Sequence, residues 1–472
     1  MDTPLCVDLD GTLVKSDLLF ESFLLLIKKN PFYLFLSVWW LIVGGKAHLK
    51  QSIAARVELN PALLPYTESF LSYLHSEKAK GRQLVLATAS DMRLAKKVAD
   101  YLGIFSEVIA SDGANNLKGS RKRDTLNQKF GAKCYDYAGN AKEDLKVWRD
   151  SRAAILVNAP SKVVRQSKTI STVDRIFAEK SSRLKSIFKL LRIHQYVKNI
   201  LVFIPLIVGH LLDSAAIQNS VIAFVIFCLL ASSAYLLNDL LDIDADRQHR
   251  SKRKRAFASG DISISFGLIC SPLFLVIGLA LSMLLPVDFL LTVTVYYLLT
   301  IFYSFYFKKK MLVDVFVLAI LYTVRIMAGI AAVQSEYSPW LISFSLFLFL
   351  SLAFVKRYSE LDLMRKENKI GTTGRGYLVG DLPQLQLFGT ISGYLSVLVL
   401  ALYINSNNVL LLYRFSMFLW AICLLLLYWI SRVWMLTTRG DLHDDPVIFA
   451  LKDKVSWFTL LLTVITIIVA TL

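Results

Sequence analysis

The sequence predicts a multidomain protein in which an α/β Rossmann-like domain precedes an all-helical membrane domain. Hydrophobic residues make up 55% of the 472-residue chain, and the mean hydropathy of +0.52 is too high for an ordinary soluble enzyme. Residues 1–190 read as a mixed globular domain, whereas residues 199–472 contain apolar runs of about 20 residues, long enough to cross a bilayer. We therefore predict domains at 1–165 and 191–472, with a linker or interfacial helix at 166–190.

Strand-like and helix-like segments alternate in the first domain. This alternation is typical of a parallel α/β sheet, and the helical stretch after the first strand is long enough to form a cap at about 15–78. The predicted segments, in order, are a strand at Leu5–Leu9, a helical stretch from Leu18 to His75, a strand at Gln83–Thr88, a helix at Arg93–Leu102 and a strand at Ala153–Val157.

The second domain is predicted to contain nine membrane-spanning helices. The predicted spans are 199–215, 217–241, 263–284, 287–306, 312–333, 339–355, 386–405, 409–430 and 455–472. Lys and Arg are confined to alternate loops, near 247–255, 308–310, 356–375 and 432–454. By the positive-inside rule, this asymmetry places the N-terminus and the first domain in the cytoplasm and the C-terminus outside.

The start of the chain and its net charge also bear on localisation. The N-terminus has no basic segment followed by an apolar core, so we expect no signal peptide. We therefore expect a multi-pass protein of the cell inner (cytoplasmic) membrane. The formal net charge of +17 is explained more simply by basic loops beside anionic lipid than by nucleic acid. We expect the membrane bilayer as a partner and no nucleic acid.

An acidic stretch ends the second predicted span. Asp239, Asp242 and Asp246 are spaced i, i+3 and i+7, so on a helix they share one face. Three neighbouring carboxylates repel each other unless a cation neutralises them, and oxygen ligands suit Mg²⁺, which keeps positions open for phosphate oxygens. We predict that Asn238 and these three aspartates bind Mg²⁺ and a diphosphate. The alternative is a solvated helix end that is acidic without function.

A second carboxylate pair follows the first predicted strand. Asp8-Leu9-Asp10-Gly11-Thr12 is followed along the chain by Leu84–Thr88, then by Lys118, and then by Gly139-Asn140 with Asp144. This ordered set resembles the four motifs of the haloacid dehalogenase (HAD) superfamily of phosphohydrolases, and the resemblance covers about residues 1–165.

The chemistry of phosphoryl transfer gives these residues roles. Asp8 can attack phosphorus to form an acyl phosphate, and Asp10 can protonate the leaving alkoxide and later activate water. Thr88 and Lys118 can hold the phosphoryl oxygens.

Mg²⁺ can be held here by Asp8, the Asp10 carbonyl and the fourth motif, Asn140 with Asp144. Asn140 stands where the family more often has Asp, so one negative charge is missing. The alternative is a degenerate domain kept for assembly.

The predicted cap contains an uncharged apolar run, Phe32–Val43. A run of this length is more often a buried helix than a membrane span. Its tryptophans, Trp39 and Trp40, leave another hypothesis open, in which the cap lies on the membrane interface and the phosphatase acts on a lipid-borne substrate.

The membrane domain, with NDxxDxxxD at Asn238–Asp246, resembles the UbiA superfamily of intramembrane prenyltransferases over about residues 185–472. The resemblance implies Mg²⁺ and diphosphate binding at this motif. Where the aromatic prenyltransferases carry a second acidic motif, this chain reads KRYxEL at 356–361. Together with RxHQxxKN at 192–199, this pattern is similar to the branch of decaprenyl-phosphate phosphoribosyltransferase, which joins polyprenyl phosphate to phosphoribosyl diphosphate (PRPP).

The charge of the substrates supports this branch. PRPP and a lipid phosphate together bring a diphosphate, a 5-phosphate and an acceptor phosphate, which one Mg²⁺ site and several Lys and Arg residues can bind. The candidates for the 5-phosphate are Lys252, Arg253 and Arg255. The candidates for the lipid phosphate or the diphosphate are Lys198, Lys356 and Arg357, with Tyr358 and Glu360 orienting these cations or the ribose. The remaining candidates are Asn199 and the two charged residues within a span, Asp314 and Arg325, which need a polar cavity or a partner there.

We therefore expect a transferase that moves 5-phosphoribosyl from PRPP to a polyprenyl phosphate and releases pyrophosphate. The HAD-like domain is expected to remove the 5-phosphate of the product. One alternative is a prenyltransferase with an aromatic or small acceptor and a structural or regulatory HAD-like domain; another is a transporter. A homo-oligomer is left open.

Overall fold

The computed structural model describes residues 3–112, 116–178, 183–249, 252–368, 375–406, 409, 413–442 and 445–472. The chain forms two compact units that interleave along the sequence. The α/β unit contains Met1–Leu191 and Tyr235–Cys270, and the helical unit contains Arg192–Ala234 and Ser271–Leu472. The predicted domains are contiguous, whereas the acidic motif belongs to the same unit as the α/β sheet.

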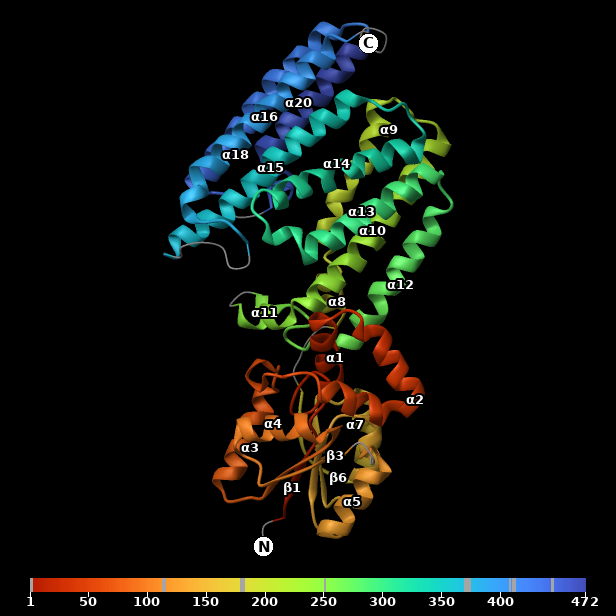
Figure 1. The fold of residues 1–472 in the computed structure, drawn as a ribbon, viewed down its shortest axis with the longest axis vertical. Helices are drawn as coiled ribbons and strands as arrows, with labels where there is room; N and C mark the ends of the chain where they lie inside the picture. The colour runs from red at the N-terminus through yellow and green to blue at the C-terminus, as the bar shows by residue number, and fades with distance from the viewer. Residues whose placement is uncertain are drawn as a thin grey trace. The chain divides into compact units, whose positions relative to one another are not determined.

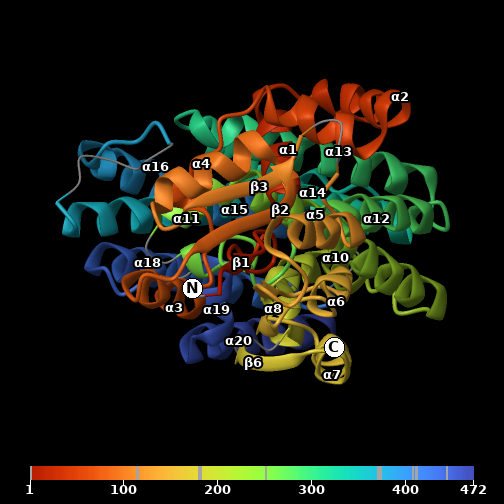
Figure 2. The same cartoon turned by 90° about the horizontal axis from the view of Figure 1, so that it is seen from below.

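A six-stranded parallel sheet forms the centre of the α/β unit (Figures 1 and 2). Its order is β3-β2-β1-β4-β5-β6, so β1 lies between β2 and β4. Every residue of β1 is buried, as expected for a strand covered on both faces. The strands are β1 (Leu5–Val7), β2 (Leu84–Asp91), β3 (Glu107–Ser111), β4 (Asp136–Gly139), β5 (Ala153–Val157) and β6 (Thr172–Phe177).

Alternating residues of β2 enter two apolar clusters on opposite faces of the sheet. Leu84 and Leu86 belong to one cluster, and Val85 and Ala87 belong to the other. The helices that follow the strands are α4 (Met92–Leu102), α5 (Ser120–Phe130), α6 (Leu145–Trp148), α7 (Ser161–Ile170) and α8 (Arg183–Leu190). Because β6 pairs with β5, the sheet continues past the boundary predicted at residue 165, and α7 and β6 fill the first part of the predicted linker. Residues 179–182 of that linker lie outside the described residues.

The segment predicted as the cap is helical. It contains α1 (Leu18–Lys29), α2 (Tyr33–Ala54), the short 3₁₀ helix η1 (Pro61–Leu63) and α3 (Glu68–Ala79). Gly45 interrupts α2 with φ +66°, a backbone conformation open to glycine. The α2 helix consequently consists of two helical parts that meet at a kink at Gly45.

The part of the chain that the structure describes has eight helices long and apolar enough to cross a membrane, or up to nine if one bent pair counts as a span. The spans are α10 (Ser214–Leu241), α12 (Ile264–Ser282), α13 (Val287–Phe305), α14 (Val313–Val333), α15 (Pro339–Lys366), α16 (Leu382–Ile404) with η6 (Val379–Asp381), α18 (Trp420–Arg439) with η7 (Ser416–Leu419), and α20 (Lys454–Thr471).

The first predicted span, 199–215, differs most from the structure. There the chain forms η3 (Ile193–Phe203) and α9 (Ile204–Val208), which reach the length of a span only together with Leu184–Leu190 across a bend. The predicted span at 409–430 includes residues 410–412, which lie outside the described residues, and the helix found nearby begins later, at η7. Shorter helices lie between spans: α11 (Ile243–Gln248), η4 (Lys252–Lys254), η5 (Phe307–Lys309) and α19 (Pro446–Lys452).

The helical unit packs around α14. Residues of α14 enter both of its large apolar clusters, with Val315 and Ala319 in one and Val317 and Leu321 in the other. The first cluster also draws on α15, α16 and α18, and the second on α10 and α13. Much of α14 is therefore covered by neighbouring helices, and its two charged residues, Asp314 and Arg325, are buried.

Candidate functional sites

Asp8 lies at the carboxyl end of β1, in the middle of the sheet, and is buried. Its carboxylate is 2.8 Å from Nζ of Lys122, in the first turn of α5. Burial raises the pKa of Asp8 to about 6, while Lys122 acts in the opposite direction and Asp144 adds to the increase. A buried carboxylate at a strand end, facing a single ammonium group, is an arrangement suited to binding and attacking a phosphoryl group.

The lysine beside Asp8 is Lys122 and not Lys118, the lysine predicted for this site. Lys118 is exposed and pairs with Glu143 at 3.0 Å, whereas Lys122 is buried and bonds both Asp8 and the hydroxyl of Tyr137 at 2.8 Å. Sequence reasoning missed Lys122 because the choice between two lysines four residues apart depends on where α5 begins. That start, Ser120, follows Gly119 at φ +60°, and no pattern of the surrounding sequence indicates it.

Asp10 accepts two hydrogen bonds that fix its carboxyl group. The Leu18 N–H at the start of α1 donates to Oδ1 at 2.8 Å, and the Ser90 hydroxyl donates to Oδ2 at 2.5 Å. Burial raises the pKa of Asp10 to about 7, with Asp17 adding to the increase and Ser90 opposing it. A carboxyl group that keeps its proton near neutral pH is suited to general acid catalysis. Thr88 is fully buried nearby, and its hydroxyl oxygen accepts from the Ser90 N–H at 3.0 Å.

Asn140 and Asp144 belong to one loop after β4. Asp144 Oδ2 accepts from the N–H groups of Asn140 at 3.0 Å and of Ala141 at 2.9 Å, and Tyr137 donates its hydroxyl proton to Oδ1 at 3.0 Å. The Asn140 side chain lies against Gly11, where an added Cβ would come within 2.2 Å of the Asn140 amide nitrogen. Asp144 therefore holds the loop, and Asn140 is the member of this motif placed beside the Asp8–Asp10 turn.

The acidic motif folds at the end of α10 and in α11. Asp239 and Asp246 are buried, and both contact Nη1 of Arg255, at 3.1 and 2.8 Å. Burial raises the pKa of Asp246, while Arg255 opposes the increase and Asp239 adds to it. Asn238 and Asp242 are partly exposed. The Asp246 N–H donates to the Asp242 carbonyl at 2.8 Å, which is the hydrogen-bond spacing of an α-helix.

Within the described residues, no group of three or more His, Cys, Asp or Glu side chains has the geometry of a metal site. The donor chemistry of both carboxylate sites nevertheless fits Mg²⁺, since all the candidate ligands are oxygens. In the acidic motif, two carboxylates already converge on one cationic nitrogen, so this position accommodates positive charge.

The basic residues that follow the acidic motif separate into two groups. Lys252 and Arg253 are exposed on η4, while Arg255 is turned to the motif. Arg247, which the sequence analysis did not single out, forms a buried double contact with Glu21 of α1, at 2.6 and 3.1 Å. This ion pair attaches the cap of the HAD-like site to α11.

In the helical unit, Lys198 and Lys356 meet at Asp445, a residue that the sequence analysis missed. Their Nζ atoms lie 2.7 and 3.2 Å from Oδ2 of Asp445. Burial opposes ionisation of Asp445, but Lys356 and Lys198 outweigh it and hold the pKa of this carboxyl below its usual value. Asp445 also accepts from the Val447 N–H at 3.2 Å at the start of α19. Its place before Pro446 is the signal of a helix start that sequence reasoning had available.

Arg357 and Asp314 form a second, fully buried ion pair, with Nε and Oδ2 2.5 Å apart. The Tyr377 hydroxyl donates to the other oxygen of Asp314 at 2.5 Å. Glu360 contacts Arg357, and Arg375 at 2.5 Å. The structure thus brings together three of the predicted substrate residues and gives Asp314 the partner that an intramembrane carboxylate needs.

Tyr358 lies apart from these clusters of charge, whereas Asn199 follows Lys198 in η3. Tyr358 is buried in an apolar cluster, with its ring 6.1 Å from that of Trp434. Arg325 and Lys198 both lie over the ring of Tyr322, 5.4 and 5.6 Å from its centre. The guanidinium group of Arg325 donates to Asn199 Oδ1 at 3.1 Å and to the Tyr296 hydroxyl at 2.8 Å. This buried hydrogen-bonded group connects η3, α13 and α14, which indicates a structural role for Asn199 and Arg325.

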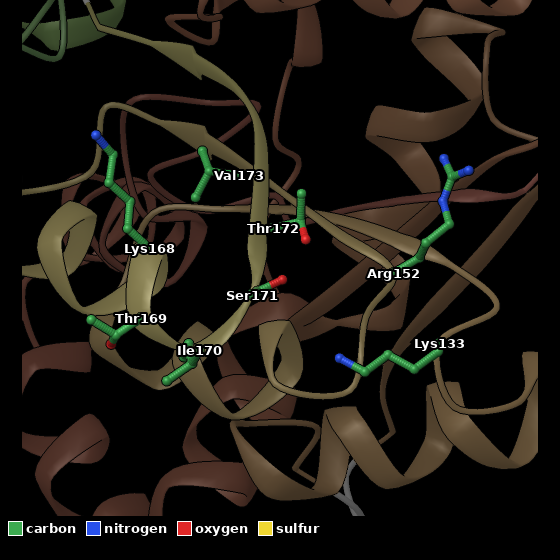
Figure 3. A pocket seen from close by; sticks show the side chains of 8 residues that line it. All are labelled: Lys133, Arg152, Lys168, Thr169, Ile170, Ser171, Thr172 and Val173. Carbon is green, nitrogen blue, oxygen red and sulfur yellow. The ribbon is translucent and has the colours of Figure 1, made fainter.

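A pocket of about 630 Å³ is lined by residues that include Lys133, Arg152 and Thr172 (Figure 3). Arg152 precedes β5 and Thr172 begins β6, so these side chains lie at the amino ends of parallel strands. Lys133, which also lines the pocket, donates to the backbone carbonyls of Arg149 and Ser151. The pocket therefore lies at the opposite ends of the strands from Asp8, and neither Asp8 nor Asp10 lines it.

The fold and these sites define a multi-pass membrane enzyme that carries an α/β domain with a phosphohydrolase-like carboxylate pair. The chain belongs to the UbiA prenyltransferase family, whose sequence model matches residues 202–453, more than half of the chain. It is a UbiA-family transferase, and its N-terminal α/β domain resembles the HAD phosphohydrolases.

Three relatives illustrate the extent of the similarity. The uncharacterized protein y4nM of Sinorhizobium fredii is 37% identical over 460 residues, which cover 96% of this chain and 88% of y4nM, so the match spans both units. Nodulation protein NoeC of Azorhizobium caulinodans is 32% identical over 262 residues, 56% of this chain and 85% of its own. Decaprenyl-phosphate phosphoribosyltransferase of Corynebacterium glutamicum is 35% identical over 178 residues, 37% of this chain and 54% of its own.

Solved structures are similar at a greater distance. A UbiA homolog from Archaeoglobus fulgidus bound to GPP and Mg²⁺ is 16% identical, with a TM-score of 0.47 over 60% of this chain and 99% of that chain. A substrate complex of phosphoserine phosphatase is 14% identical, with a TM-score of 0.28 over 40% of this chain and 98% of that chain. The assignment to the UbiA family rests on the sequence match.

Proposed function

We propose that the membrane domain transfers the 5-phosphoribosyl group of PRPP to a polyprenyl phosphate. The observation that carries this proposal is the number of cationic side chains in the helical unit. Lys198 and Lys356 share Asp445, and Arg357, the residue after Lys356 in α15, is buried. A substrate pair with several phosphate groups needs such cations, whereas a prenyl diphosphate and a neutral acceptor do not. The similarity to decaprenyl-phosphate phosphoribosyltransferase supports the same substrates.

In this reaction an oxygen of the lipid phosphate attacks C1 of the ribose. A new C–O bond forms as the bond between C1 and the diphosphate breaks, and pyrophosphate leaves with the electron pair. Asn238, Asp239, Asp242 and Asp246 are the residues that would hold Mg²⁺, which neutralises charge on the departing diphosphate. Arg255, already bonded to Asp239 and Asp246, keeps these carboxylates in position.

The cations are assigned to the remaining phosphates. Lys198 and Lys356 are positioned by one carboxylate oxygen of Asp445, and other N–H groups of the two ammonium ions are assigned to the incoming phosphate. Lys252 and Arg253, exposed beside the acidic motif in sequence, are assigned to the 5-phosphate of the ribose. These roles exclude Tyr358, Asn199 and Arg325, whose side chains have structural partners.

The HAD-like domain is proposed to remove the 5-phosphate of the lipid-linked product. Asp8 attacks phosphorus, the bond from phosphorus to the ribose oxygen breaks, and Asp10 donates a proton to that oxygen. Water then hydrolyses the acyl phosphate and releases inorganic phosphate, with Asp10 accepting the proton. Lys122 and Thr88 hold the phosphoryl oxygens, and Mg²⁺, held by Asp8 and the carbonyl groups of Asp10 and Asn140, would offset the phosphate charge.

The experiment supplies the full chain in detergent with PRPP labelled in the ribose, decaprenyl phosphate and Mg²⁺. The expected result is label in the lipid extract as a pentose, and Asp246→Asn should abolish this transfer, whereas the exposed Asp261→Asn should retain it. Asp8→Asn should leave transfer intact and cause the phosphorylated lipid to accumulate. Absence of any lipid-linked pentose, with consumption of prenyl diphosphate instead, would overturn the transferase proposal.

A further inference from the structure

The outer face of α2 is apolar and has no partner among the described residues. Phe35 is 72% exposed, Trp39 is 61% exposed and Ile42 is 73% exposed. These residues are spaced i, i+4 and i+7, so they form one stripe along the helix, and Phe32 and Val43 extend it at the ends. The expectation of a buried helix at Phe32–Val43 is therefore wrong for this face. A contiguous exposed apolar surface of this kind marks an interaction site.

The opposite face of α2 is fixed to the cap. Trp40 is buried in a cluster with Leu26 of α1 and with Ile53 and Val57, and the Arg56 guanidinium lies 4.7 Å from the centre of its ring. The outer stripe therefore has a defined direction, because the inner face is packed. Both views of the α/β unit show α2 at its periphery (Figures 1 and 2).

The cap is attached to the end of a membrane span. In α1, Glu21 forms the buried ion pair with Arg247 of α11. Leu24 and Leu25 of α1 line a small cavity together with Leu240 and Leu241, the last residues of the span α10. All of these residues belong to the α/β unit. The α1 helix therefore lies where a spanning helix leaves the bilayer, and α2 follows it after three residues.

The length and charge of α2 fit a helix that lies on a membrane and does not cross it. The part before Gly45 has about 12 residues, or about 18 Å of helix at 1.5 Å per residue, against a hydrocarbon core of about 30 Å. No charged residue occurs between Lys29 and Lys46, and both of these lysines are exposed. An apolar face with Trp, ended by lysines, is typical of an interfacial helix on anionic lipid.

We propose that the outer face of α2 inserts into the lipid bilayer, so that the cap of the HAD-like site is docked on the membrane. The partner is the lipid surface itself, at the level where α10 ends. This inference deepens the proposed function, on which its second test rests: a docked cap brings Asp8 and Asp10 to a phosphate carried by a lipid, since the substrate need not leave the membrane.

The first test measures the depth of α2 in the full chain reconstituted in nanodiscs that contain anionic lipid. Cys134, which is exposed, and Cys270, which is half-buried, are replaced by Ser, and single cysteines are introduced as Phe35→Cys, Trp39→Cys or Ile42→Cys. A matched control is Tyr101→Cys, at an exposed site of α4. Each thiol carries a fluorophore that nitroxide-labelled lipid quenches on contact.

Lipid quenching at positions 35, 39 and 42, and its absence at position 101, is the expected result. Quenching at the three α2 positions no stronger than at position 101 would overturn the proposal. Protection of α2 from an aqueous quencher without quenching by lipid would also overturn it, in favour of a second copy of the chain on this face.

The second test separates membrane docking from catalysis. Phe35→Ser with Ile42→Ser should lower dephosphorylation of a lipid-linked phosphate in vesicles about tenfold, because the local concentration of substrate falls, while hydrolysis of p-nitrophenyl phosphate stays unchanged. Equal rates on the lipid for the variant and the unsubstituted chain would contradict the inference. If the chain hydrolyses neither substrate, the phosphatase proposal fails, and the depth measurement still decides whether α2 is docked.

Discussion

Replacing Lys122 by Met removes the buried ammonium group 2.8 Å from the Asp8 carboxylate and keeps the aliphatic part of the side chain. The matched change is Lys118→Met, at the lysine that the sequence pattern favoured and that the structure places on the surface. The two lysines are four residues apart, and each substitution removes one positive charge. The variants therefore have the same net charge and differ only in which position has lost the ammonium group.

The expected magnitudes follow from burial. A donor aimed at charge that develops on a phosphoryl group is worth about 10²–10³ in rate in a water-excluded site, and Lys122 is 5% exposed. We therefore expect Lys122→Met to lower kcat for phosphate ester hydrolysis by about 10²–10³. Lys118 and Glu143 are 61% and 47% exposed, and an exposed pair is worth about 0–1 kcal/mol, so Lys118→Met should change kcat by about fivefold or less.

The assay is the release of inorganic phosphate by the full chain in detergent, with thermal unfolding and phosphoribosyl transfer measured on the same samples. Retained transfer by Lys122→Met would show that the variant is folded. The reasoning is refuted if Lys118→Met abolishes hydrolysis while Lys122→Met, folded and active in transfer, hydrolyses at the rate of the unsubstituted chain.

Three further predictions concern the other charged groups. Asp445→Asn should raise KM for polyprenyl phosphate about tenfold, because Lys198 and Lys356 lose the carboxylate that positions them. The control Asp441→Asn, at an exposed site, should leave KM unchanged. An unchanged KM in both variants would exclude a positioning role for Asp445. Arg255→Gln should lower the initial rate of transfer about 10²-fold, since the carboxylates of Asp239 and Asp246 lose their shared partner. Arg253→Gln should lower this rate less. A larger loss for Arg253→Gln than for Arg255→Gln would contradict the role assigned to Arg255. Glu21→Gln or Arg247→Gln should each cost about 3–5 kcal/mol of stability because a buried charge is left unpaired, and the double variant Glu21→Leu with Arg247→Met should recover most of it; additive losses of melting temperature would argue against a buried pair.

Residues adjacent to predicted strands could be placed from the sequence. Asp8 and Asp10 follow or end the predicted strand that contains β1, and Thr88 ends the predicted strand that overlaps β2, a neighbour of β1. Asn140 follows β4, the other neighbour of β1, which was not among the predicted strands, so Asn140 was placed by the motif resemblance alone. Because the carboxyl ends of parallel strands share one edge of the sheet, the side chains of Asp8, Asp10 and Thr88 converge once the sheet is predicted. The lysine could not be placed in the same way, because Lys118 precedes α5 and Lys122 lies in its first turn, and neither position is fixed by a strand.

Contacts between distant segments were beyond the reach of the sequence pattern. Asp445 lies 247 residues from Lys198 and 89 from Lys356, and only the packing of the helices brings these charges together. The same reason explains why Arg247 was read as one basic loop residue among several, although it is the partner of Glu21.

Hydropathy was sufficient to predict which segments are long apolar helices, but not whether an apolar helix is covered by other parts of the protein. Apolar runs of the right length became helices in most of the predicted spans, since length and composition decide whether a segment crosses a bilayer. The same signal at Phe32–Val43 does not distinguish a helix covered by protein from one left open, because both are equally apolar. Exposure had to come from the structure.

The α1 helix connects the turn that contains Asp10 with the residue that follows the acidic motif. Its first N–H group, from Leu18, is bonded to Asp10, and one turn later Glu21 is bonded to Arg247, the residue after Asp246. A helix is stiff over one turn, so a movement of the cap that admits or releases a phosphate has either to break the ion pair or to carry α11 with it. We expect phosphate binding at Asp8 and Asp10 to change the affinity of the acidic motif for its ligand. Because coupling between two sites is reciprocal, ligand binding at the acidic motif should change phosphate affinity at Asp8 and Asp10 by the same factor. Under the proposed function, α1 would be the mechanical connection that keeps the dephosphorylation in step with the transfer.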